Sequence, residues 1–472
     1  MRAAAAAAPG AAALVDGGRV VTWAELAEEV ARAVAWLDRE GWANPDRLAG
    51  RGVQRPVVAL TGDASAAGVV RLLALIETGL APLVLHPRWT AAERAAAVAT
   101  AGVVPILDSV EKWAATPAGP ALAAPPDDER ALAAIFTSGS AGTPRAAVLS
   151  RRAVVAAAAA SAANLGWFED DRWLLSLTPA HVGGLSVLTR ALLARTAIVL
   201  APAGPFDVGG FIETVAASRV TLASLVPTML HRLLECTPVW TPPRALRAIL
   251  LGGAAATPAL LARAAERDLP VLTTYGLTET CAQVATQRPG AIDRDPRGAT
   301  PPLPGVEVRI VAGEIQVRGP SLFSGYLTPG GIDLPLEPGG WFATGDLGRV
   351  DEAGNLHVHG RSDDRIRSSG EGVDPHEIET VLLDFGGVAE ACVFAVADEQ
   401  RGEVVAAALV PAGPVLDLTG LAQHCSRRLA AFKRPRLVVV LDRMPVAPSG
   451  KVARRAVAAS VGDRLVPFDI TS

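Results

Sequence analysis

Lysine is scarce in this chain. Lys112, Lys433 and Lys451 are the only lysines, although Lys and Arg together number 44, so nearly every cation is an arginine. A lysine that is present despite this bias is a candidate for a position whose function requires lysine and not arginine. Lys451 ends a loop over residues 445–451, Pro-Val-Ala-Pro-Ser-Gly-Lys, and is the strongest candidate. A plain lysine at a helix start is the alternative.

Cysteine is also rare, and its four occurrences are scattered. No C-x-x-C pair joins them, which argues against a zinc site and against a disulfide framework. The pattern fits the reducing environment of the cytoplasm, where we expect the protein. The four positions are Cys236, Cys281, Cys392 and Cys425.

The chain has neither an excess of positive charge nor a long apolar run. Its formal net charge is −4 over 472 residues, so it lacks the electrostatic footprint of a nucleic-acid-binding protein. The most apolar segment, residues 185–203, contains Arg190 and Arg195, and Pro9 with Gly10 interrupts the Ala-rich N-terminus. We therefore expect no signal peptide and no membrane insertion.

Composition supports a large core, since 50% of the residues are hydrophobic and 19% are charged. Strands and helices alternate to about residue 290, which indicates parallel sheets covered on both faces. Short alternating strands then predict a small β-rich subdomain, and an α+β unit of domain size follows. We predict an α/β fold with an N-terminal domain over residues 1–360 and a C-terminal domain over residues 361–472.

The individual elements come from hydrophobic periodicity and from cap and turn signals. Thr22 and Glu25 have the spacing of a capping box at the start of the first predicted helix. Helices are predicted at residues 22–37, 66–77, 151–163, 375–383 and 418–429, and strands at residues 57–60, 81–85, 131–136, 173–177, 197–200, 222–226, 247–251, 271–274, 306–310, 314–318, 356–359, 389–394, 404–410 and 436–440.

Residues 135–145, Ile-Phe-Thr-Ser-Gly-Ser-Ala-Gly-Thr-Pro-Arg, have the composition of a polyphosphate-binding loop. Glycines let backbone N–H groups approach closely, hydroxyls donate hydrogen bonds, and Arg145 offsets charge. The expected order is a strand, this loop and a helix capped by Ser150. The loop lacks the G-x-x-x-x-G-K-[ST] order of a P-loop NTPase, and an ordinary surface loop is the alternative.

Two further segments combine polar side chains with glycine. Residues 274–280, Thr-Tyr-Gly-Leu-Thr-Glu-Thr, follow a predicted strand, at the end where ligands bind in α/β sheets. There Tyr275 suits stacking on a base, Thr278 a phosphate and Glu279 a Mg²⁺ ion, whereas a capped turn is the alternative. Asp346, between glycines, suits ribose hydroxyls or an ordinary turn.

In this order the motifs resemble those of the ANL superfamily of adenylate-forming enzymes: acyl- and aryl-CoA synthetases, nonribosomal-peptide adenylation domains and luciferases. Three segments, residues 179–190, 226–234 and 275–286, are most similar to the o-succinylbenzoate–CoA ligases of menaquinone biosynthesis. The motif matches are residues 137–145, 275–280, 344–347, 360–379 and 448–451.

The resemblance implies an acid–CoA ligase that uses ATP, Mg²⁺ and coenzyme A in two steps. Lys451, Thr278, Glu279 and His181 are then the catalytic residues, with Glu279 as the metal ligand and Asp363 as the hinge. Residues expected at the nucleotide are Thr137, Ser138, Gly139, Ser140, Gly142, Arg145, Gly252, Gly253, Ala254, Tyr275, Gly276, Asp346 and Arg361. Residues expected at the acyl group and CoA are His181, Gly184, Ser186, Gln283 and Gly370.

The sequence departs from the superfamily pattern at several positions. Arg145 stands where Lys is common, Ala141 replaces a common Thr, and Ala180 replaces a common aromatic residue. Residues 369–372 are Ser-Gly-Glu-Gly where Gly-Gly-Glu-Asn is usual, which affects the loop expected at the thioester step.

Two alternatives stay open at this point. One is another aryl- or acyl-CoA ligase, or an enzyme that loads an acid onto a carrier protein. The other is a non-catalytic nucleotide-binding protein, against which Lys451, Glu279 and Asp346 argue. The expected partners are a small carboxylic acid, ATP and CoA, with no nucleic acid, and a homodimer is left open.

Overall fold

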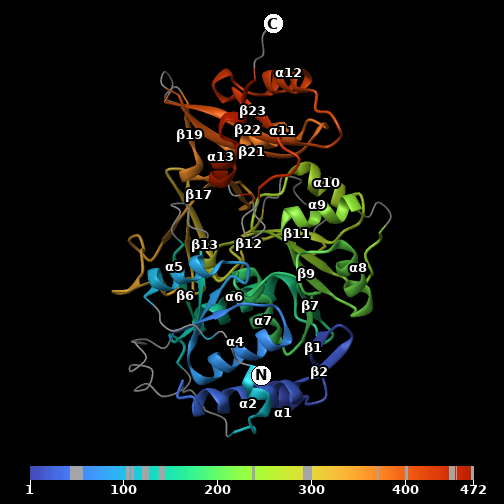
Figure 1. The fold of residues 1–472 in the computed structure, drawn as a ribbon, viewed down its shortest axis with the longest axis vertical. Coiled ribbons are helices and arrows are strands. Elements are labelled where there is room, and N and C mark those ends of the chain that lie inside the picture. The colour runs from blue at the N-terminus through green and yellow to red at the C-terminus, as the bar shows by residue number, and fades with distance from the viewer. Residues whose placement is uncertain are drawn as a thin grey trace.

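The computed structural model shows a large body with a smaller unit at one end (Figure 1). The N-terminus lies in the large body. The described residues are 1–42, 57–102, 107, 111–119, 127–137, 144–236, 240–290, 300–368, 371–398, 402–445, 452 and 454–468.

An eight-stranded sheet forms one half of the body. Its strands are β1 (Ala12–Asp16), β2 (Arg19–Thr22), β7 (Arg172–Leu175), β8 (Ala197–Leu200), β9 (Leu222–Leu225), β10 (Ala248–Leu251), β11 (Val271–Tyr275) and β12 (Ala285–Thr286). The order is β12-β11-β10-β9-β7-β8-β1-β2, parallel from β11 to β1 and antiparallel at both edges.

Helices cover both faces of this sheet because successive side chains of a strand point to opposite sides. Ile249 and Leu251 pack in a core with one helix layer, whereas Ala248 and Leu250 pack in the core on the other face. The first layer is α8 (Val208–Ala217), α9 (Pro227–Cys236) and α10 (Pro258–Ala265), and the second includes α6 (Arg151–Leu165) and α7 (Val182–Ala194).

A six-stranded sheet forms the other half of the body. It contains β3 (Val57–Thr61), β4 (Ala81–Leu85), β5 (Ala131–Phe136), β6 (Ala146–Ser150), β15 (Gly325–Thr328) and β16 (Gly331–Asp333). The order is β16-β15-β6-β5-β4-β3, with β3, β4 and β5 parallel and the remaining pairs antiparallel.

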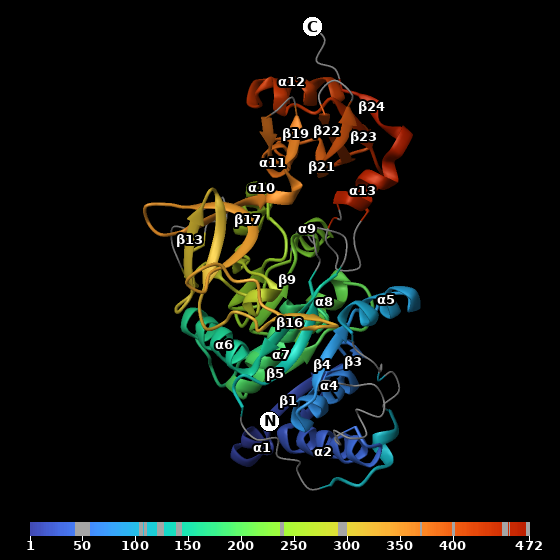
Figure 2. The same cartoon turned by 90° about the vertical axis from the view of Figure 1, so that its left-hand side faces the viewer.

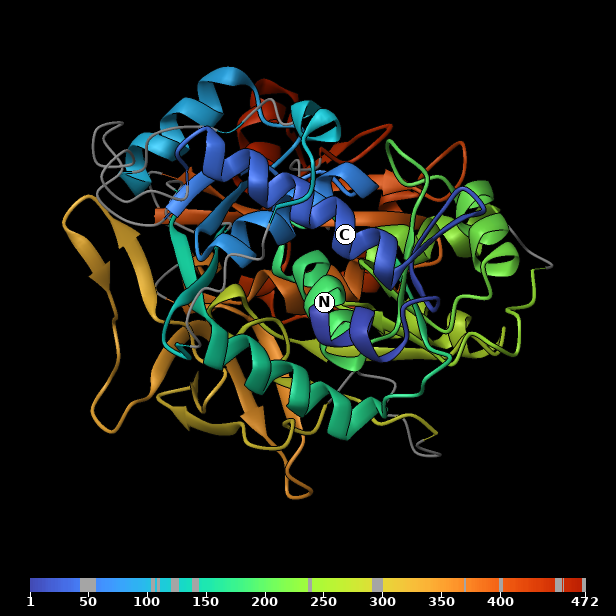
Figure 3. The same cartoon turned by 90° about the horizontal axis from the view of Figure 1, so that it is seen from below.

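The two sheets share one core, which the N-terminal helices complete. Leu60 of β3 and Ile135 of β5 pack in the same cluster as Trp23 and Leu75 of these helices. Figure 3 shows the N-terminal helices across the lower end of the body. They are α1 (Arg2–Ala7), α2 (Trp23–Arg39) and α4 (Ala66–Thr78), while α5 (Ala91–Ala101) covers the outer face of the six-stranded sheet.

A four-stranded antiparallel sheet follows, as the β-rich pattern predicted. Its order is β13-β14-β17-β18, from strands β13 (Glu307–Val311), β14 (Glu314–Arg318), β17 (Phe342–Val350) and β18 (Leu356–Arg361). Short 3₁₀ helices elsewhere are η1 (Glu111–Ala115), η2 (Thr278–Thr280), η3 (Ser362–Asp364), η4 (Ala431–Lys433) and η5 (Gly462–Arg464).

The smaller unit is an α+β sandwich (Figure 2). Its strands are β19 (Ile366–Ser368), β20 (Glu371–Val373), β21 (Val388–Asp398), β22 (Gly402–Pro411), β23 (Leu437–Val440) and β24 (Val466–Pro467). Leu382 of α11 (Pro375–Leu383) and Leu421 of α12 (Leu418–Arg428) pack on one face, and Val457 of α13 (Arg454–Val461) packs on the other.

Nearly all predicted helices and strands are present, although many ends are shifted. The Thr22 hydroxyl accepts from the Glu25 N–H at 3.2 Å and the Glu25 carboxylate accepts from the Thr22 N–H at 2.7 Å, which confirms the capping box. Ser150 caps α6, as predicted. No helix in the described ranges combines the length and apolar character needed to cross a membrane.

The expected strand–loop–helix order around the phosphate loop is wrong in one respect. β6 lies between the loop and α6, and it pairs antiparallel with β5, so the loop joins two strands of a hairpin. All five residues of β6 are buried, and β6 also pairs with the distant β15. Further strands that the sequence patterns did not predict are β1, β2, β12, β15, β16, β17, β19, β20 and β24.

Candidate functional site

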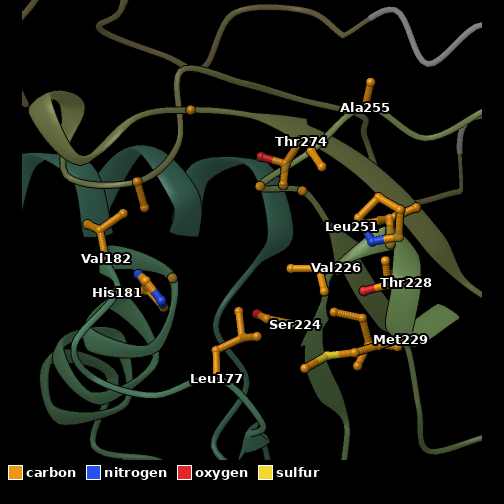
Figure 4. Close-up of a pocket in the computed structure, with 18 of the residues that line it drawn as sticks. Leu177, His181, Val182, Ser224, Val226, Thr228, Met229, Leu251, Ala255 and Thr274 are labelled. Atoms are coloured by element: carbon orange, nitrogen blue, oxygen red, sulfur yellow. The ribbon is translucent and has the colours of Figure 1, made fainter. Parts of the chain in front are cut away.

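One continuous cleft runs between the large body and the smaller unit. Figure 4 shows a part of it, where His181 and Val182 at the start of α7 face residues that follow β9 and β10. The cleft therefore lies at the carboxyl ends of parallel strands, where α/β sheets bind ligands.

Thr137 and Arg145 flank the predicted phosphate loop. The Thr137 N–H donates to the Arg145 carbonyl oxygen at 2.8 Å, which closes the base of the loop. The Thr137 hydroxyl is buried in the cleft wall and has no hydrogen-bond partner among the described residues. Ser138, Gly139, Ser140 and Gly142 lie outside the described residues.

Tyr275, Asp346 and Arg361 form one hydrogen-bonded group across β11, β17 and β18. The Tyr275 hydroxyl donates to Asp346 Oδ2 at 2.7 Å, and Arg361 Nη1 donates to Oδ1 at 3.1 Å. Burial, and then the Asp346 charge, raise the pKa of Tyr275 well above its usual value, so the phenol remains a donor. The structure thus brings together the residues predicted for the base and for the ribose.

Glu279 and Thr278 lie in η2 and line the cleft. Glu279 is buried, and its Oε1 accepts a hydrogen bond from the Tyr326 hydroxyl at 2.7 Å. Arg145 Nη2 donates to the same hydroxyl at 3.2 Å. The predicted metal carboxylate and the predicted phosphate cation are therefore linked through Tyr326, which sequence reasoning did not assign.

Glycines form the cleft wall where backbone segments approach closely. A Cβ on Gly252 would lie 2.7 Å from Thr274 Cγ2, and a Cβ on Gly276 would lie 1.4 Å from the Ala282 carbonyl oxygen. Gly253 has a φ of +82°. With Ala254, these residues line the cleft next to Tyr275, as the prediction for the nucleotide requires.

The side of the cleft predicted to hold the acyl group contains His181, Ser186 and Gln283. Gln283 is buried, donates to Thr286 Oγ1 at 2.7 Å, and has an Oε1 without a partner in the described part of the chain. Gly184 does not line the cleft, because it packs so closely that a Cβ would lie 2.3 Å from the Thr178 carbonyl oxygen. Its neighbour Gly183 lines the cleft instead.

Arg190, on α7, is a site residue that sequence reasoning missed. Its side chain reaches the cleft, although only 2% of the residue is exposed. The guanidinium carbon lies 5.3 Å from the centre of the Trp173 ring, and Nη2 has no hydrogen-bond partner within the described ranges. Burial lowers the pKa of Arg190 to about 10. The signal in the sequence was an arginine inside an otherwise apolar helix.

His86, which follows β4, is a second missed residue. It is 3% exposed, lines the cleft, and its ring centre lies 5.2 Å from that of His181. Its Nδ1 accepts from the Arg88 N–H at 3.2 Å, so Nε2 carries the hydrogen in the neutral ring. Burial lowers the pKa of His86 to about 4, which keeps the ring neutral.

The predicted catalytic lysine and thioester-loop glycine are not placed by the structure. Lys451 and Gly370 lie outside the described residues, so their roles stay predictions. Asp363 lies in η3, directly after β18, and lines the cleft. Three residues beyond Lys451, Arg454 Nη2 lies 3.0 Å from Glu379 Oε1, which ties the start of α13 to α11.

The donor chemistry fits a Mg²⁺ ion that is held together with substrate phosphates. No group of three or more metal-ligating side chains occurs in the described ranges, so a site built from protein ligands alone is absent there. Magnesium usually takes one or two carboxylates plus phosphate oxygens and waters. Glu279 supplies one carboxylate in the cleft, on the same side as Thr137 and Arg145.

This fold and cleft define a class of nucleotide-activating enzymes built from a large and a small domain. Residues 1–327 match the family of AMP-binding enzymes and residues 377–451 match the AMP-binding enzyme C-terminal domain, so the chain belongs to that family.

Several named members of this family are similar to this chain. The 2-succinylbenzoate–CoA ligase of Bacillus licheniformis is 37% identical over 330 residues, which are 68% of this chain and 68% of that protein. The o-succinylbenzoate CoA synthetase of Bacillus subtilis, solved with ATP and magnesium ion, is 30% identical with a TM-score of 0.83, covering 97% of this chain and 98% of that one. The same enzyme with the acyl-adenylate intermediate OSB-AMP is 29% identical with a TM-score of 0.82, covering 96% of each chain.

Proposed function

We propose that this chain is an ATP- and Mg²⁺-dependent ligase that converts 2-succinylbenzoate to 2-succinylbenzoyl-CoA. The relatives support this function by their names and by their coverage of both parts of the chain. The free cysteines, three of them buried, support a cytoplasmic location.

The reaction has two steps on one site. A substrate carboxylate oxygen attacks the α-phosphorus of ATP, the bond to the bridging oxygen breaks, and pyrophosphate leaves. The CoA sulfur then attacks the acyl carbon, the bond from that carbon to the adenylate oxygen breaks, the thiol proton goes to solvent, and AMP leaves. Because the first step joins two anions, cationic stabilisation should dominate its rate.

We assign the nucleotide side of the cleft by what each group can bind. Tyr275 and the backbone at Gly252 and Gly253 flank the base, and Asp346 with Arg361 faces the ribose. Thr137, Thr278 and Arg145 face the phosphates. Glu279 would hold Mg²⁺, which neutralises phosphate charge when bound. We assign Lys451 to the α-phosphate and the reacting carboxylate.

The observation that carries the choice of acid is Arg190. A buried guanidinium whose Nη2 has no partner among the described residues costs free energy in the empty protein, so an anionic group that enters the cleft would stabilise it. 2-Succinylbenzoate has two carboxylates: one reacts with ATP, and we assign the other to Arg190. An acid with a single carboxylate would leave this cation unpaired.

The test is ATP–pyrophosphate exchange with a panel of acids, followed by thioester formation with and without CoA. We expect exchange with 2-succinylbenzoate, and only weak exchange with benzoate or with fatty acids. Exchange with those acids but not with 2-succinylbenzoate would contradict the assigned substrate. Absence of exchange with every acid would favour a non-catalytic nucleotide-binding protein.

A further inference from the structure

Tyr326 is a buried polar residue in the cleft for which the proposed mechanism so far has no role. It lies on β15, is 3% exposed, and packs edge-on against Phe323 with ring centres 4.9 Å apart. The chain has only 2 tyrosines, and the other is Tyr275. A buried phenol normally has a hydrogen-bond partner, so its contacts indicate what it is there to hold.

The Tyr326 hydroxyl joins two opposite charges. It donates to Glu279 Oε1 at 2.7 Å and accepts from Arg145 Nη2 at 3.2 Å. The Arg145 guanidinium carbon also lies 3.9 Å from the centre of the Tyr326 ring, so the cation stacks on the ring face. One side chain therefore fixes the positions of the carboxylate and of the cation.

On the basis of the proposed function, we propose that Tyr326 is a positioning residue for the magnesium–ATP complex. By occupying Oε1 of Glu279 it leaves Oε2 for the metal, and by holding Arg145 it sets the phosphate cation beside the metal site. The residue acts through Glu279 and Arg145, without contact to the reacting atoms.

The contact also gives a reason for Arg145 at a position where the superfamily commonly has lysine. A planar guanidinium can stack on the phenol ring while one of its nitrogens donates to the hydroxyl. A lysine ammonium is a compact charge and does not offer this combination. The pairing of Arg145 with Tyr326 therefore explains the substitution by geometry, not by the general bias toward arginine alone.

The test variant is Tyr326→Phe, which keeps the ring and removes the hydroxyl. The measurement is calorimetric titration of a non-hydrolysable ATP analogue, once with Mg²⁺ and once with a chelator. A hydrogen bond to a charged group is worth a factor of about 10 to 100, so we expect Kd to rise by that factor with Mg²⁺. Without metal we expect Kd to change by less than about 3-fold.

The matched control is Leu327→Val on the same strand. Leu327 packs in the core on the opposite face of the sheet, so it perturbs β15 without removing the hydroxyl. Circular dichroism establishes that both variants are folded. In a Glu279→Gln background, Tyr326→Phe should raise the Kd measured with Mg²⁺ by less than about 3-fold. The carboxylate that the hydroxyl positions is then gone, and the phenylalanine ring still stacks on Arg145.

Equal losses of affinity with and without Mg²⁺, or no loss in either, would overturn the role of Tyr326. Fully additive effects of Glu279→Gln and Tyr326→Phe on Kd would also overturn it. So would a metal-dependent loss of nucleotide affinity in Leu327→Val as large as that in Tyr326→Phe. If the wild-type protein binds no nucleotide under either condition, the proposed function itself fails, and this outcome is distinct from failure of the Tyr326 role alone.

Discussion

Replacing Arg190 with methionine should make the empty protein more stable and the enzyme less selective. Burial lowers the pKa of Arg190 in the folded protein from its usual value to about 10. The charged form is therefore disfavoured in the fold, by about 3 kcal/mol at neutral pH. Methionine has a similar length and no charge, so Arg190→Met removes this penalty and loses the contact with Trp173, worth about 1 kcal/mol.

The expected net gain in the free energy of unfolding is about 1 to 3 kcal/mol, measured by urea unfolding without substrate. Removing one partner of a buried, hydrogen-bonded charge pair costs about 2 to 5 kcal/mol. The kcat/KM for 2-succinylbenzoate should therefore fall by about 30-fold to a few thousand-fold. The compound 4-oxo-4-phenylbutanoate has the same skeleton with only one carboxylate. We expect its kcat/KM to change by less than about 3-fold.

Arg195→Met is the matched control, because Arg195 is an exposed arginine at the C-terminal end of the same helix. We expect it to leave both stability and selectivity unchanged. A less stable Arg190→Met protein that loses activity equally on both acids would refute the reasoning and give Arg190 a purely structural role.

Three further predictions concern pH and the nucleotide. The pKa of His86 is about 4 in the folded protein against an ordinary 6.5, so the folded state becomes less stable as the pH decreases from 6.5 to 4. We therefore compare the free energy of unfolding of His86→Gln with that of wild type, by urea unfolding at pH 5 and at pH 7.5. The difference should be about 2 kcal/mol more favourable to the variant at pH 5, and an equal difference at both pH values would contradict this. Lys451→Ala should slow ATP–pyrophosphate exchange at least about 100-fold while supplied acyl-adenylate still reacts with CoA, whereas equal loss of both steps would contradict the hinge hypothesis. Arg145→Lys should raise the KM for ATP about 3- to 10-fold in steady-state assays, and an unchanged KM would remove the stacking argument.

The sequence alone predicts elements whose signals are local. The capping box of Thr22 and Glu25 and the Ser150 cap of α6 mark helices because the cap and the helix are adjacent in the chain. β4 and β8 were predicted with their bounds because each is a short apolar run with turns on both sides. β6 and β15 were missed because what makes them strands is mutual pairing between distant segments.

In the candidate site, too, local motifs were predictable from the sequence and contacts between distant residues were not. The residue types of Tyr275, Glu279 and Asp346 suit a base, a metal and a ribose, and the family resemblance chose these roles over ordinary turns. That Tyr275 bonds Asp346, and that Tyr326 bonds Glu279, depends on which strands are neighbours in space.

By itself the sequence determined an α/β fold, the nucleotide motifs with their resemblance to adenylate-forming enzymes, and the absence of a P-loop motif, because motifs depend on residue type and spacing. Only the tertiary structure decided that Arg190 is a buried cation in the cleft whose Nη2 lacks a partner among the described residues, and that Tyr326 holds Glu279 and Arg145 together. Burial and hydrogen bonding between distant residues set the charge and position of a group, and neither can be obtained from its neighbours in the chain.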